Sequence, residues 1–393
     1  MRPAAASVRW RILALANAAD RRRRLINQRR KSRALLRINV DAFDLPEAEF
    51  IKTFRLGKEQ VRALIQELTP YLSTQRRRDG ISNDLKVLIT LALYATGSYQ
   101  TLVGQSVFHN VAQTTVSRSV RQVTDAINKI YSNHIKWPML PQERNAIKAQ
   151  FYHRFGIPGV LGCIDGTQVA IIRPVHHEER FFNRKGYHSL NVMIICDSEL
   201  NILCMDASSP GSAHDSMVWQ GHPLSRHLTD LSNNGEQVFL LGDSGYPLRA
   251  TMMTPILNTR EGSPEHYYYQ HHVTARNVVE RCIGVLKARF RCLLVARALH
   301  YNPITAAKIV NACCVLHNIA NQNRAPLLSL TPAEAEDQIG GNERLNPQNR
   351  RVNPELLRGR ELQQSLVERL WRERLVCMQV LYLVYNKGYN KTV

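Results

Sequence analysis

Paired cysteine motifs and long apolar runs are both missing from this 393-residue sequence. None of the eight cysteines stands in a C-x-x-C pair, and most lie in apolar stretches, as is typical of reduced packing residues in an intracellular protein. The segment 313–317, Cys-Cys-x-x-His, has residue types that bind metals, but its helical, hydrophobic setting favours core packing. No run reaches the roughly 18 apolar residues that a membrane span needs.

Acidic residues are scarce beside basic ones, and the formal net charge is +20. Residues 1–40 hold 12 Lys or Arg and one acid, Asp20, so both this arm and the rest of the chain are basic. Two basic regions indicate a polyanionic partner, and nucleic acid is favoured over a membrane because no amphipathic anchor is evident. The alternative is a basic surface that is merely solvated.

The N-terminal arm allows two destinations in the cell. Its Arg-rich, Ala-rich and acid-poor start resembles a mitochondrial transit peptide. The stretch DRRRRLINQRRKSR, residues 20–33, is more typical of a nuclear import signal or a polyanion-binding arm. We favour the nucleus, with the cytoplasm as a further location, and mitochondrial targeting stays open.

The pattern along the chain predicts five regions. They are a basic arm that is mobile or helical only in patches (1–45), an all-α helix-turn-helix-like domain (46–155), an α/β nuclease-like domain (156–323), a linker (324–355), and a C-terminal helix with a tail (356–393).

Two expected helices, 98–107 and 113–130, have helix-turn-helix proportions. The second would present Arg118 and Arg121 on its outer face, where they could contact DNA. A plain helical bundle gives the same pattern, and the connector lacks a Ser or Asp cap. DNA contact by this segment is therefore one of two open interpretations.

From residue 159 the hydrophobic period changes from helical to strand-like. Apolar runs at 160–171, 188–197, 201–208 and 237–246 predict strands, and DSELN, residues 197–201, predicts a tight hairpin turn between the second and the third. Helical patterns are interleaved with the strands, including a long helix from about Thr274 to Cys292. We expect a mixed sheet flanked by helices.

Three acids stand where this scaffold would bring them together. Asp165 interrupts a buried strand, Asp243 follows another strand, and Glu280 lies on the long helix at the border between core and solvent. The same flank of that helix holds Arg276, Lys287 and Arg291. Close carboxylates repel one another, and Mg²⁺ or Mn²⁺ would relieve this because both ions take oxygen ligands. Two such ions can activate water and stabilise the leaving oxygen of a phosphodiester.

The segments IDGT, GDSGYP and NVVERCIGVLKARFRCL, in this order, resemble the DDE endonuclease domain of PIF/Harbinger-type transposases. The resemblance spans roughly residues 50–320 and the helix LRGRELQQSLVERL. It implies an RNase H-like catalytic domain, with Asp165, Asp243 and Glu280 as the metal-binding catalytic triad. It also implies a separate Myb-like protein for DNA recognition and nuclear entry.

The sequence thus predicts a metal-dependent DNA endonuclease of transposase descent that leaves a 3′ hydroxyl, and transposase activity stays open. The alternative is a catalytically silent DNA-binding or adaptor protein that inherited the fold. The presence of all three acids favours the enzyme. Homo-oligomer formation is a further open expectation.

Other polar residues near these motifs have competing interpretations. Asp215 follows His214, but the spacing Ser212-x-x-Asp215 favours a capping box over a catalytic role. We expect His176 and His177 to be surface or substrate-side residues. Candidate contacts to DNA phosphates are Arg184, Lys185, Tyr187, Arg276, Lys287 and Arg291.

Overall fold

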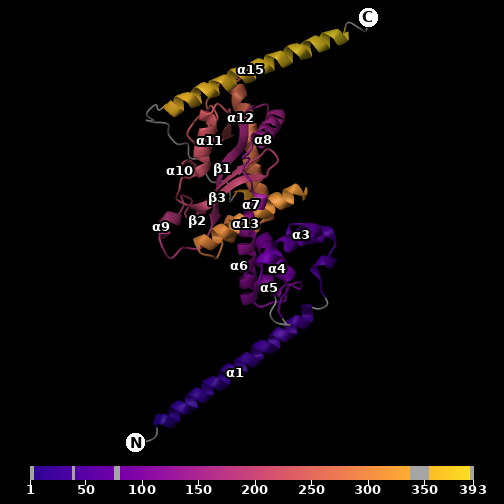
Figure 1. The fold of residues 1–393 in the computed structure, drawn as a ribbon, viewed down its shortest axis with the longest axis vertical. Helices are drawn as coiled ribbons and strands as arrows, with labels where there is room; N and C mark the ends of the chain where they lie inside the picture. The colour runs from indigo at the N-terminus through magenta and orange to yellow at the C-terminus, as the bar shows by residue number, and fades with distance from the viewer. Residues whose placement is uncertain (1–3, 38–39, 75–79, 337–353, 390–393) are drawn as a thin grey trace. The chain divides into compact units, whose positions relative to one another are not determined.

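The computed structural model describes residues 4–37, 40–74, 80–336 and 354–389. The chain separates into two compact units, Met1–Lys129 and Ile130–Val393, and each is described by itself (Figure 1).

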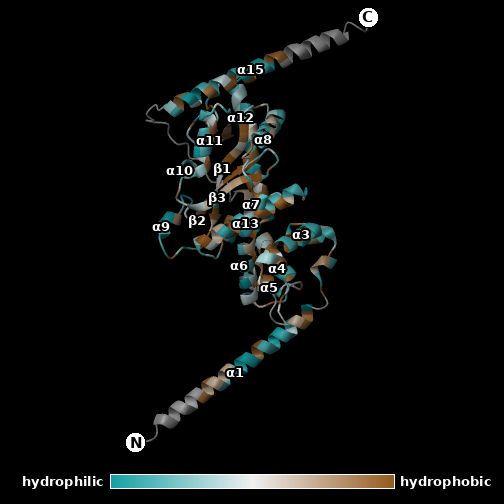
Figure 2. Ribbon diagram, viewed as in Figure 1, coloured by the Kyte–Doolittle hydropathy of each residue, from teal (hydrophilic) through white to brown (hydrophobic). Residues whose placement is uncertain are grey.

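The basic arm is one continuous helix, α1 (Ala4–Arg37), so the expectation of a mobile or patchy arm was wrong. Its composition explains the helix, because Ala, Leu and Arg are among the best helix formers. Bands of hydrophilic and hydrophobic residues alternate along α1 without a continuous apolar stripe (Figure 2). From Leu13 onward, its side chains are largely exposed.

The rest of the first unit is a small helical bundle. It consists of α2 (Glu47–Phe54), α3 (Lys58–Leu68), α4 (Asn83–Thr96), α5 (Gln100–Gln105) and α6 (Gln113–Lys129), with short 3₁₀ turns at Ala42–Asp44 and Thr69–Tyr71. Both ends of α4 have capping residues. The Ser82 hydroxyl accepts a hydrogen bond from the Leu85 amide at 3.2 Å, and Gly97 ends the helix with a φ of 59°.

Helices α5 and α6 are the pair predicted to form a helix-turn-helix. Residues 106–112 connect them, a longer segment than the 3–4 residues usual in that motif. Arg118 and Arg121 are exposed on α6, together with Thr114. The helix pair is therefore present, and its identity as a DNA-binding motif stays a prediction.

The second unit contains a mixed five-stranded sheet in the order β3-β2-β1-β4-β5. β1 pairs antiparallel with β2 and parallel with β4. This is the predicted α/β architecture. The strands are β1 (Val160–Ala170), β2 (Ser189–Cys196), β3 (Ile202–Pro210), β4 (Phe239–Leu241) and β5 (Met252–Met253).

Helices cover both faces of this sheet. α12 packs on β1 and β2, whereas the core that includes Trp219 and Leu228, from α10 and α11, packs against Ile164 and Ile195. The helices of this unit are α7 (Tyr131–His134), α8 (Pro141–Phe155), α9 (Glu178–Phe181), α10 (Asp215–Gly221), α11 (Pro223–Asn233), α12 (Pro264–Arg289), α13 (Pro303–Gln322), α14 (Pro332–Glu336) and α15 (Pro354–Tyr389), with 3₁₀ turns at Arg291–Leu293 and Val295–Arg297.

The long helix begins ten residues earlier than predicted, at Pro264 rather than Thr274. Ser263 explains this start, because its hydroxyl accepts a hydrogen bond from the His266 amide at 3.1 Å, and Pro264 suits the first helical position. The aromatic and histidine residues of the first turns obscured the helical pattern in the sequence.

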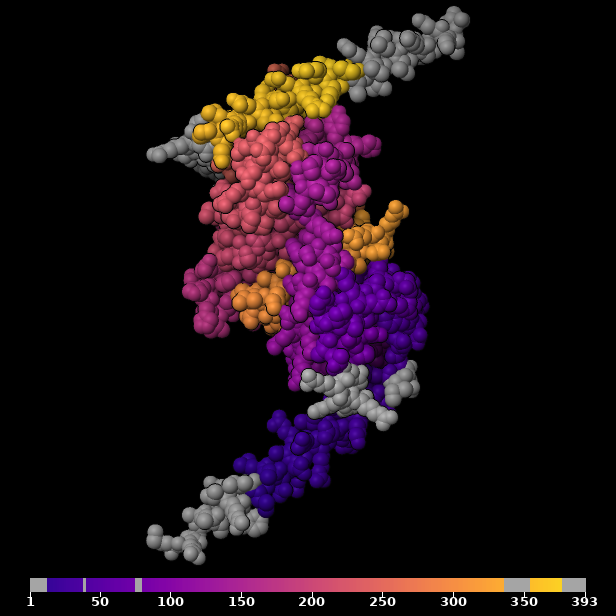
Figure 3. Space-filling view, in the orientation of Figure 1, coloured from indigo at the N-terminus to yellow at the C-terminus, as the bar shows by residue number. Residues whose placement is uncertain are grey.

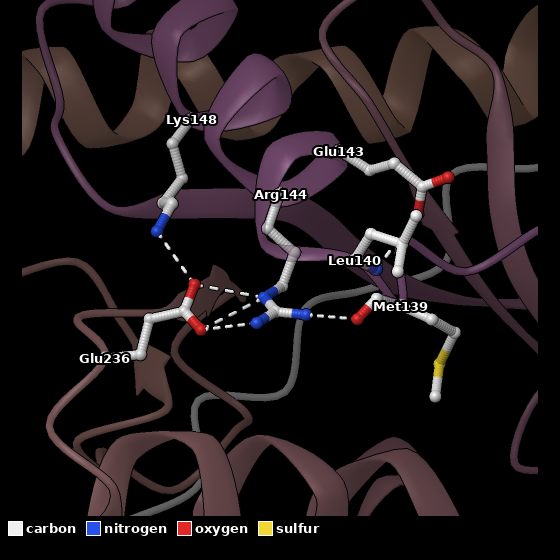
Figure 4. A network of polar contacts seen from close by, with 6 residues as sticks. All are labelled: Met139, Leu140, Glu143, Arg144, Lys148 and Glu236. Atoms are coloured by element: carbon white, nitrogen blue, oxygen red, sulfur yellow. Dashed lines mark hydrogen bonds and ion pairs between the residues drawn. The ribbon is translucent and has the colours of Figure 1, made fainter.

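Helix α8 falls within the range predicted for the helical domain (46–155), but it packs on β1 and belongs to the second unit. An ion-pair network fastens it there (Figure 4). Arg144 donates to Glu236 Oε2 at 2.6 Å, and Lys148 donates to Glu236 Oε1 at 2.9 Å. Because Glu236 lies shortly before β4, this network fixes the approach to that strand.

The predicted C-terminal helix is α15, and it continues to Tyr389. It packs on α12 and β5, and Figure 3 shows its yellow residues lying across the rest of the second unit. Gln363 donates to the Thr254 carbonyl at 2.8 Å. Residues 337–353 of the predicted linker lie outside the described residues. No helix in the described part of the chain has the length and apolarity to span a membrane.

Of the seven cysteines whose side chains the structure describes, six are buried, as predicted. Cys313, Cys314 and His317 are buried in α13, and the His317 ring lies 2.9 Å from the Leu200 carbonyl. The predicted tight turn between β2 and β3 is also confirmed. Asp197 accepts hydrogen bonds there from the amides of Glu199 and Asn201.

Candidate active site

Asp165 lies within β1, beyond the point where that strand has a neighbour on its β4 side. The pairing of β1 with β4 ends at Cys163 and Leu241. The Cys163 thiol donates to the Ala275 carbonyl of α12, and alternation along the strand places Asp165 on the same side. Oδ1 of Asp165 accepts a hydrogen bond from the Gly166 amide at 2.9 Å.

Asp243 enters the same region from the end of β4, as the sequence predicted. It follows Gly242, where an added Cβ would stand 2.9 Å from atoms of Met252 and Tyr246, so only glycine fits this turn. Oδ1 of Asp243 accepts a hydrogen bond from the Gly245 amide at 3.0 Å.

Glu280 reaches the region from α12 together with Arg276. The Arg276 guanidinium donates to Asp165 Oδ2 at 2.8 Å and also forms an ion pair with Glu280, one helical turn away. The Arg276 side chain is 13% exposed, and the Glu280 side chain is 51% exposed. The half-exposed side chain of Glu280 agrees with its predicted position at the border between core and solvent.

Burial and neighbouring charge raise the pKa of Asp165 to about 7. Burial is the largest cause, the Arg276 charge acts against it, and the charges of Asp243 and Asp215 raise the pKa further. One guanidinium therefore does not balance the negative charge around Asp165.

The acids line one cavity of about 820 Å³. The same cavity is lined by four cations. Its acidic residues are Asp165, Asp215, Asp243 and Glu280, and its basic residues are Arg184, Lys185, Arg276 and Lys287. Anionic and cationic groups in one cavity suit a ligand that carries phosphates and is bound with a metal ion.

Lys287 is buried in the cavity wall, whereas the sequence placed it with Glu280 at the border between core and solvent. Its Nζ donates to the Gln168 carbonyl at 2.9 Å. Burial lowers the pKa of Lys287 to about 7, and the Lys185 charge acts in the same direction. A phosphate beside this amine would favour its charged form.

The loop around Arg184 forms another part of the cavity wall. Arg184 and Lys185 are exposed, Tyr187 lines the cavity, and Arg184 donates to the ring of His214. His176 and His177 do not line the cavity, in agreement with their predicted surface position.

Arg291 is a candidate that the fold does not bring to this site. It lies in the 3₁₀ turn after α12, and its guanidinium pairs with Glu334 at 2.8 Å. Helical spacing placed it beside Arg276 and Lys287, but the helix ends at Arg289 before it is reached.

Asp215 is a cavity residue whose sequence interpretation was wrong. It is the first residue of α10, and the N-cap residue is His214, whose side chain makes no capping bond. Ser212 therefore forms no capping box with Asp215. The sequence shows only the local spacing of Ser212 and Asp215. The side chain that contacts the Asp215 carboxylate comes from β2. Asn191 Nδ2 donates to Asp215 Oδ1 at 2.6 Å.

Asp206 lies inside β3, and it does not line the cavity. Oδ1 of Asp206 accepts a hydrogen bond from the Ser208 amide at 2.7 Å. It therefore has a local role.

Across the described residues, no three His, Cys, Asp or Glu side chains converge closely enough to hold a metal ion as they stand. Between Asp165 and Glu280 the structure places the Arg276 guanidinium instead. The carboxylate oxygens nevertheless fit a hard divalent cation, since four carboxylates line one cavity and Arg276 of α12 pairs with only two of them, Asp165 and Glu280.

Comparison with known proteins points to the region that contains these cavity acids. The family described as DDE superfamily endonuclease matches residues 164–318, which include all four cavity acids. Putative nuclease HARBI1 of Bos taurus is 33% identical over 336 residues, covering 84% of this chain and 94% of the relative. The Homo sapiens protein of that name shows the same identity and coverage.

This chain belongs to the Harbinger transposase-derived nuclease family. A more distant relative, Protein ALP1-like of Arabidopsis thaliana, is 24% identical over 249 residues, covering 60% of this chain and 59% of the relative. No solved structure matches the chain. The resemblance seen in the sequence is thereby confirmed at the level of the family.

Proposed function

We propose that this member of the Harbinger transposase-derived nuclease family is a metal-dependent DNA endonuclease, with Asp165, Asp243 and Glu280 as its catalytic acids. The observation that carries the proposal is that these acids, which come from β1, the end of β4 and α12, line one cavity with four cations. Acids that only solvate or stabilise a protein surface would not need to line one cavity together.

A divalent cation, Mg²⁺ or Mn²⁺, would be held by Asp165, Asp243 and Glu280. When bound, it supplies Lewis acidity that activates water and stabilises the oxygen that leaves the phosphorus. The raised pKa of Asp165 supports the fit, because a nearby positive charge would favour the carboxylate. Arg276 pairs with two of the three acids, so it would have to withdraw.

The residues of the chain then have distinct tasks in hydrolysis. Arg184, Lys185 and Lys287 would hold phosphates of the DNA strand, and Arg276 would join them when it leaves the acids. Water attacks the phosphorus in line, the bond from phosphorus to O3′ breaks, and O3′ takes up a proton. The products are a 3′ hydroxyl and a 5′ phosphate.

The second candidate function is a DNA-binding or adaptor protein without catalytic activity. The observation that favours it is the Arg276 bridge, which occupies the position between Asp165 and Glu280. The presence of all three acids favours the nuclease.

Further features of this proposal rest on the family and on charge. A separate Myb-like protein would supply DNA recognition, and the basic helix α1 would serve nuclear import or bind nucleic acid. We propose the nucleus and the cytoplasm as locations. Transposase activity and the formation of a homo-oligomer also stay hypotheses.

Cleavage of supercoiled plasmid by the full chain tests the proposal without a known target sequence. We expect nicking with Mn²⁺ and none with EDTA. The double variant Asp165→Asn, Asp243→Asn should lose activity by about 10³-fold or more. A matched double variant, Asp206→Asn, Asp230→Asn, removes two acids outside the cavity and should cut like the parent.

Two results would contradict parts of this proposal. If the parent does not cut with any divalent metal, alone or with its DNA-binding partner, the adaptor function replaces the nuclease. If the Asp165, Asp243 double variant cuts like the parent, the assignment of the triad is wrong.

A further inference from the structure

Residues 325–336 form a strap that follows α13 and contributes to the wall of the candidate active site. At the start of the strap, the Ala325 carbonyl accepts a hydrogen bond from the buried Arg289 guanidinium at 3.5 Å. Near its other end, Leu330 and Ala335 line the cavity that holds the candidate acids. The strap lies beyond residues 164–318, which match the endonuclease family, so that match does not explain it.

The strap reaches the cavity on the side of α12, because Glu334 of the strap pairs with Arg291 just after the end of that helix. Ile283, Gly284 and Lys287 of α12 line the same cavity. A Cβ added to Gly284 would meet nothing within 4 Å, so there is open space beside the helix at this position. Since Lys287 is one of the proposed phosphate ligands, a DNA strand that enters this space would meet the strap.

The ion pair between Arg291 and Glu334 fastens the far end of the strap. Arg291 Nη2 lies 2.8 Å from Oε1 and 2.9 Å from Oε2 of Glu334. Thr331 orients this carboxylate, because its amide and its hydroxyl both donate to Oε2, at 3.1 and 2.9 Å. The hydrogen bond from the Thr331 amide lowers the pKa of Glu334 most, and the Arg291 charge acts in the same direction. The carboxylate is therefore charged and directed at Arg291.

The rest of the strap is weakly held. Leu327, Thr331 and Pro332 are exposed, and within the described part of the chain α14 packs extensively on no other helix or strand. A helix of five residues is not stable by itself, and an ion pair with partly exposed side chains contributes little to stability. The strap can therefore leave the cavity wall without disturbing the sheet.

A DNA phosphate would compete with Glu334 for Arg291. A guanidinium binds phosphate and carboxylate through the same paired hydrogen bonds. A DNA strand brings several phosphates at once, which could also meet Lys185 and Lys287 in the cavity, whereas Glu334 is one carboxylate on a weakly held segment. While it is in place, the charge of Glu334 also repels the strand.

We propose that the strap is autoinhibitory. Glu334 keeps Arg291 from DNA, and a DNA strand that enters the cavity displaces the strap and takes Arg291 as a further phosphate ligand. This inference rests on the DNA-binding part of the proposed function and does not require cleavage. It gives a role to Arg291, which lies outside the cavity as long as the strap is in place.

Binding of a fluorescently labelled linear duplex to the full chain in EDTA, measured by anisotropy, tests the proposal without using activity. Glu334→Gln should bind the duplex about fivefold more tightly than the parent, because Arg291 is released. The slope of log affinity against log salt concentration should become steeper by about 1, since one more phosphate is contacted. Glu261→Gln makes the same change of charge at an exposed site outside the cavity and should leave the slope unchanged.

A double-mutant cycle separates the release of Arg291 from a general gain of positive charge. The double variant Arg291→Gln, Glu334→Gln should bind DNA no more tightly than Arg291→Gln alone, because no guanidinium is left to release. An equal gain from Glu334→Gln in the presence and absence of Arg291 would contradict the proposal.

Hydrogen–deuterium exchange of residues 325–336 follows the strap directly. In the parent, addition of the duplex should speed the exchange of the strap amides, including that of Thr331, which is bonded to Glu334. In Glu334→Gln the exchange should already be fast without DNA. A segment that only packs on the fold would be unaffected or further protected by DNA.

The outcomes distinguish this inference from the proposed nuclease. If Glu334→Gln binds DNA like Glu261→Gln, or if DNA slows exchange in the strap, autoinhibition is refuted, and plasmid cleavage alone decides the nuclease. If Glu334→Gln binds more tightly as expected but the plasmid is not cut with any divalent metal, the strap stands and the nuclease fails. If neither the parent nor Glu334→Gln binds DNA, the strap fails together with the DNA-binding part of the proposed function.

Discussion

Arg276 donates to Asp165 Oδ2 at 2.8 Å and pairs with Glu280 through the same guanidinium. One arginine thus neutralises part of a carboxylate cluster whose members lie far apart in the sequence. A guanidinium and a divalent cation would compete for these oxygens, and the competition has measurable consequences.

Replacing Arg276 by Gln should destabilise the metal-free protein by about 3 kcal/mol, because Asp165 loses its ion pair while remaining largely buried. The same change should tighten Mn²⁺ binding, since no internal cation has to be displaced. Urea unfolding in EDTA and calorimetric titration measure the two effects. Arg281→Gln, an exposed neighbour on α12, is the matched control. Equal behaviour of the two variants would refute the competition.

The network of Glu236 predicts a stability that depends on acid pH. The hydrogen bond from Arg144, followed by that from Lys148, lowers the pKa of Glu236 to about 2 from an ordinary 4.5. Because the folded-state pKa is lowered, the stabilisation is complete above pH 4.5 and is lost as pH falls toward 2. Its size is on the order of 3 kcal/mol.

Glu236→Gln should therefore lower the free energy of unfolding by that amount at pH 7, and its difference from the parent should shrink as pH falls to 3. Chemical unfolding across this range measures it. Glu199→Gln changes an exposed turn carboxylate and should have little effect. A difference that stays constant with pH would show that the ion pairs are not its source.

The exposed cations of the cavity loop should contribute to DNA affinity through phosphates. The double variant Arg184→Gln, Lys185→Gln should bind DNA more weakly at low salt. The slope of log affinity against log salt concentration should also become shallower by about 2. The control is Lys136→Gln, Arg297→Gln, which removes two exposed cations outside the cavity. An unchanged slope in the loop variant would exclude these contacts.

Exposed Arg118 and Arg121 of α6 test the role of the helical unit. If α6 contacts DNA, Arg118→Gln, Arg121→Gln in the full chain should reduce affinity for linear duplex in a mobility-shift assay by about tenfold. The control is the double variant Lys52→Gln, Lys129→Gln, which makes the same change of charge within that unit. Equal binding by both double variants would favour a plain helical bundle.

The order of strands and helices in the catalytic region could be predicted because it depends on local patterns. Apolar runs predicted four of the strands, and the tight turn at 197–201 depends on Asp197, whose carboxylate accepts hydrogen bonds from backbone amides of the turn. The start of α12 could not be predicted as well, because its capping residue, Ser263, precedes a turn rich in aromatic and polar residues.

The candidate acids Asp165, Asp243 and Glu280 could also be named from sequence, since each interrupts or borders an apolar pattern. The pairing of Arg276 with Asp165 could not be predicted, because a helical wheel gives the face of a side chain and not its partner on a neighbouring strand. Lys287 shows the same limit. Its position on the helical wheel was at the border between core and solvent, but the cavity wall encloses it.

The amino-acid sequence by itself determined the mixed α/β class, the family and the residues that could bind metal, because these depend on periodicity and on residue types in order. Only the tertiary structure decided that Asp215 is a cavity residue and that Arg291 is not. The reason is physical: a carboxylate acquires its role from the groups that fix and surround it. For Asp215 these are Asn191 and Gly166, each more than 20 residues away along the chain.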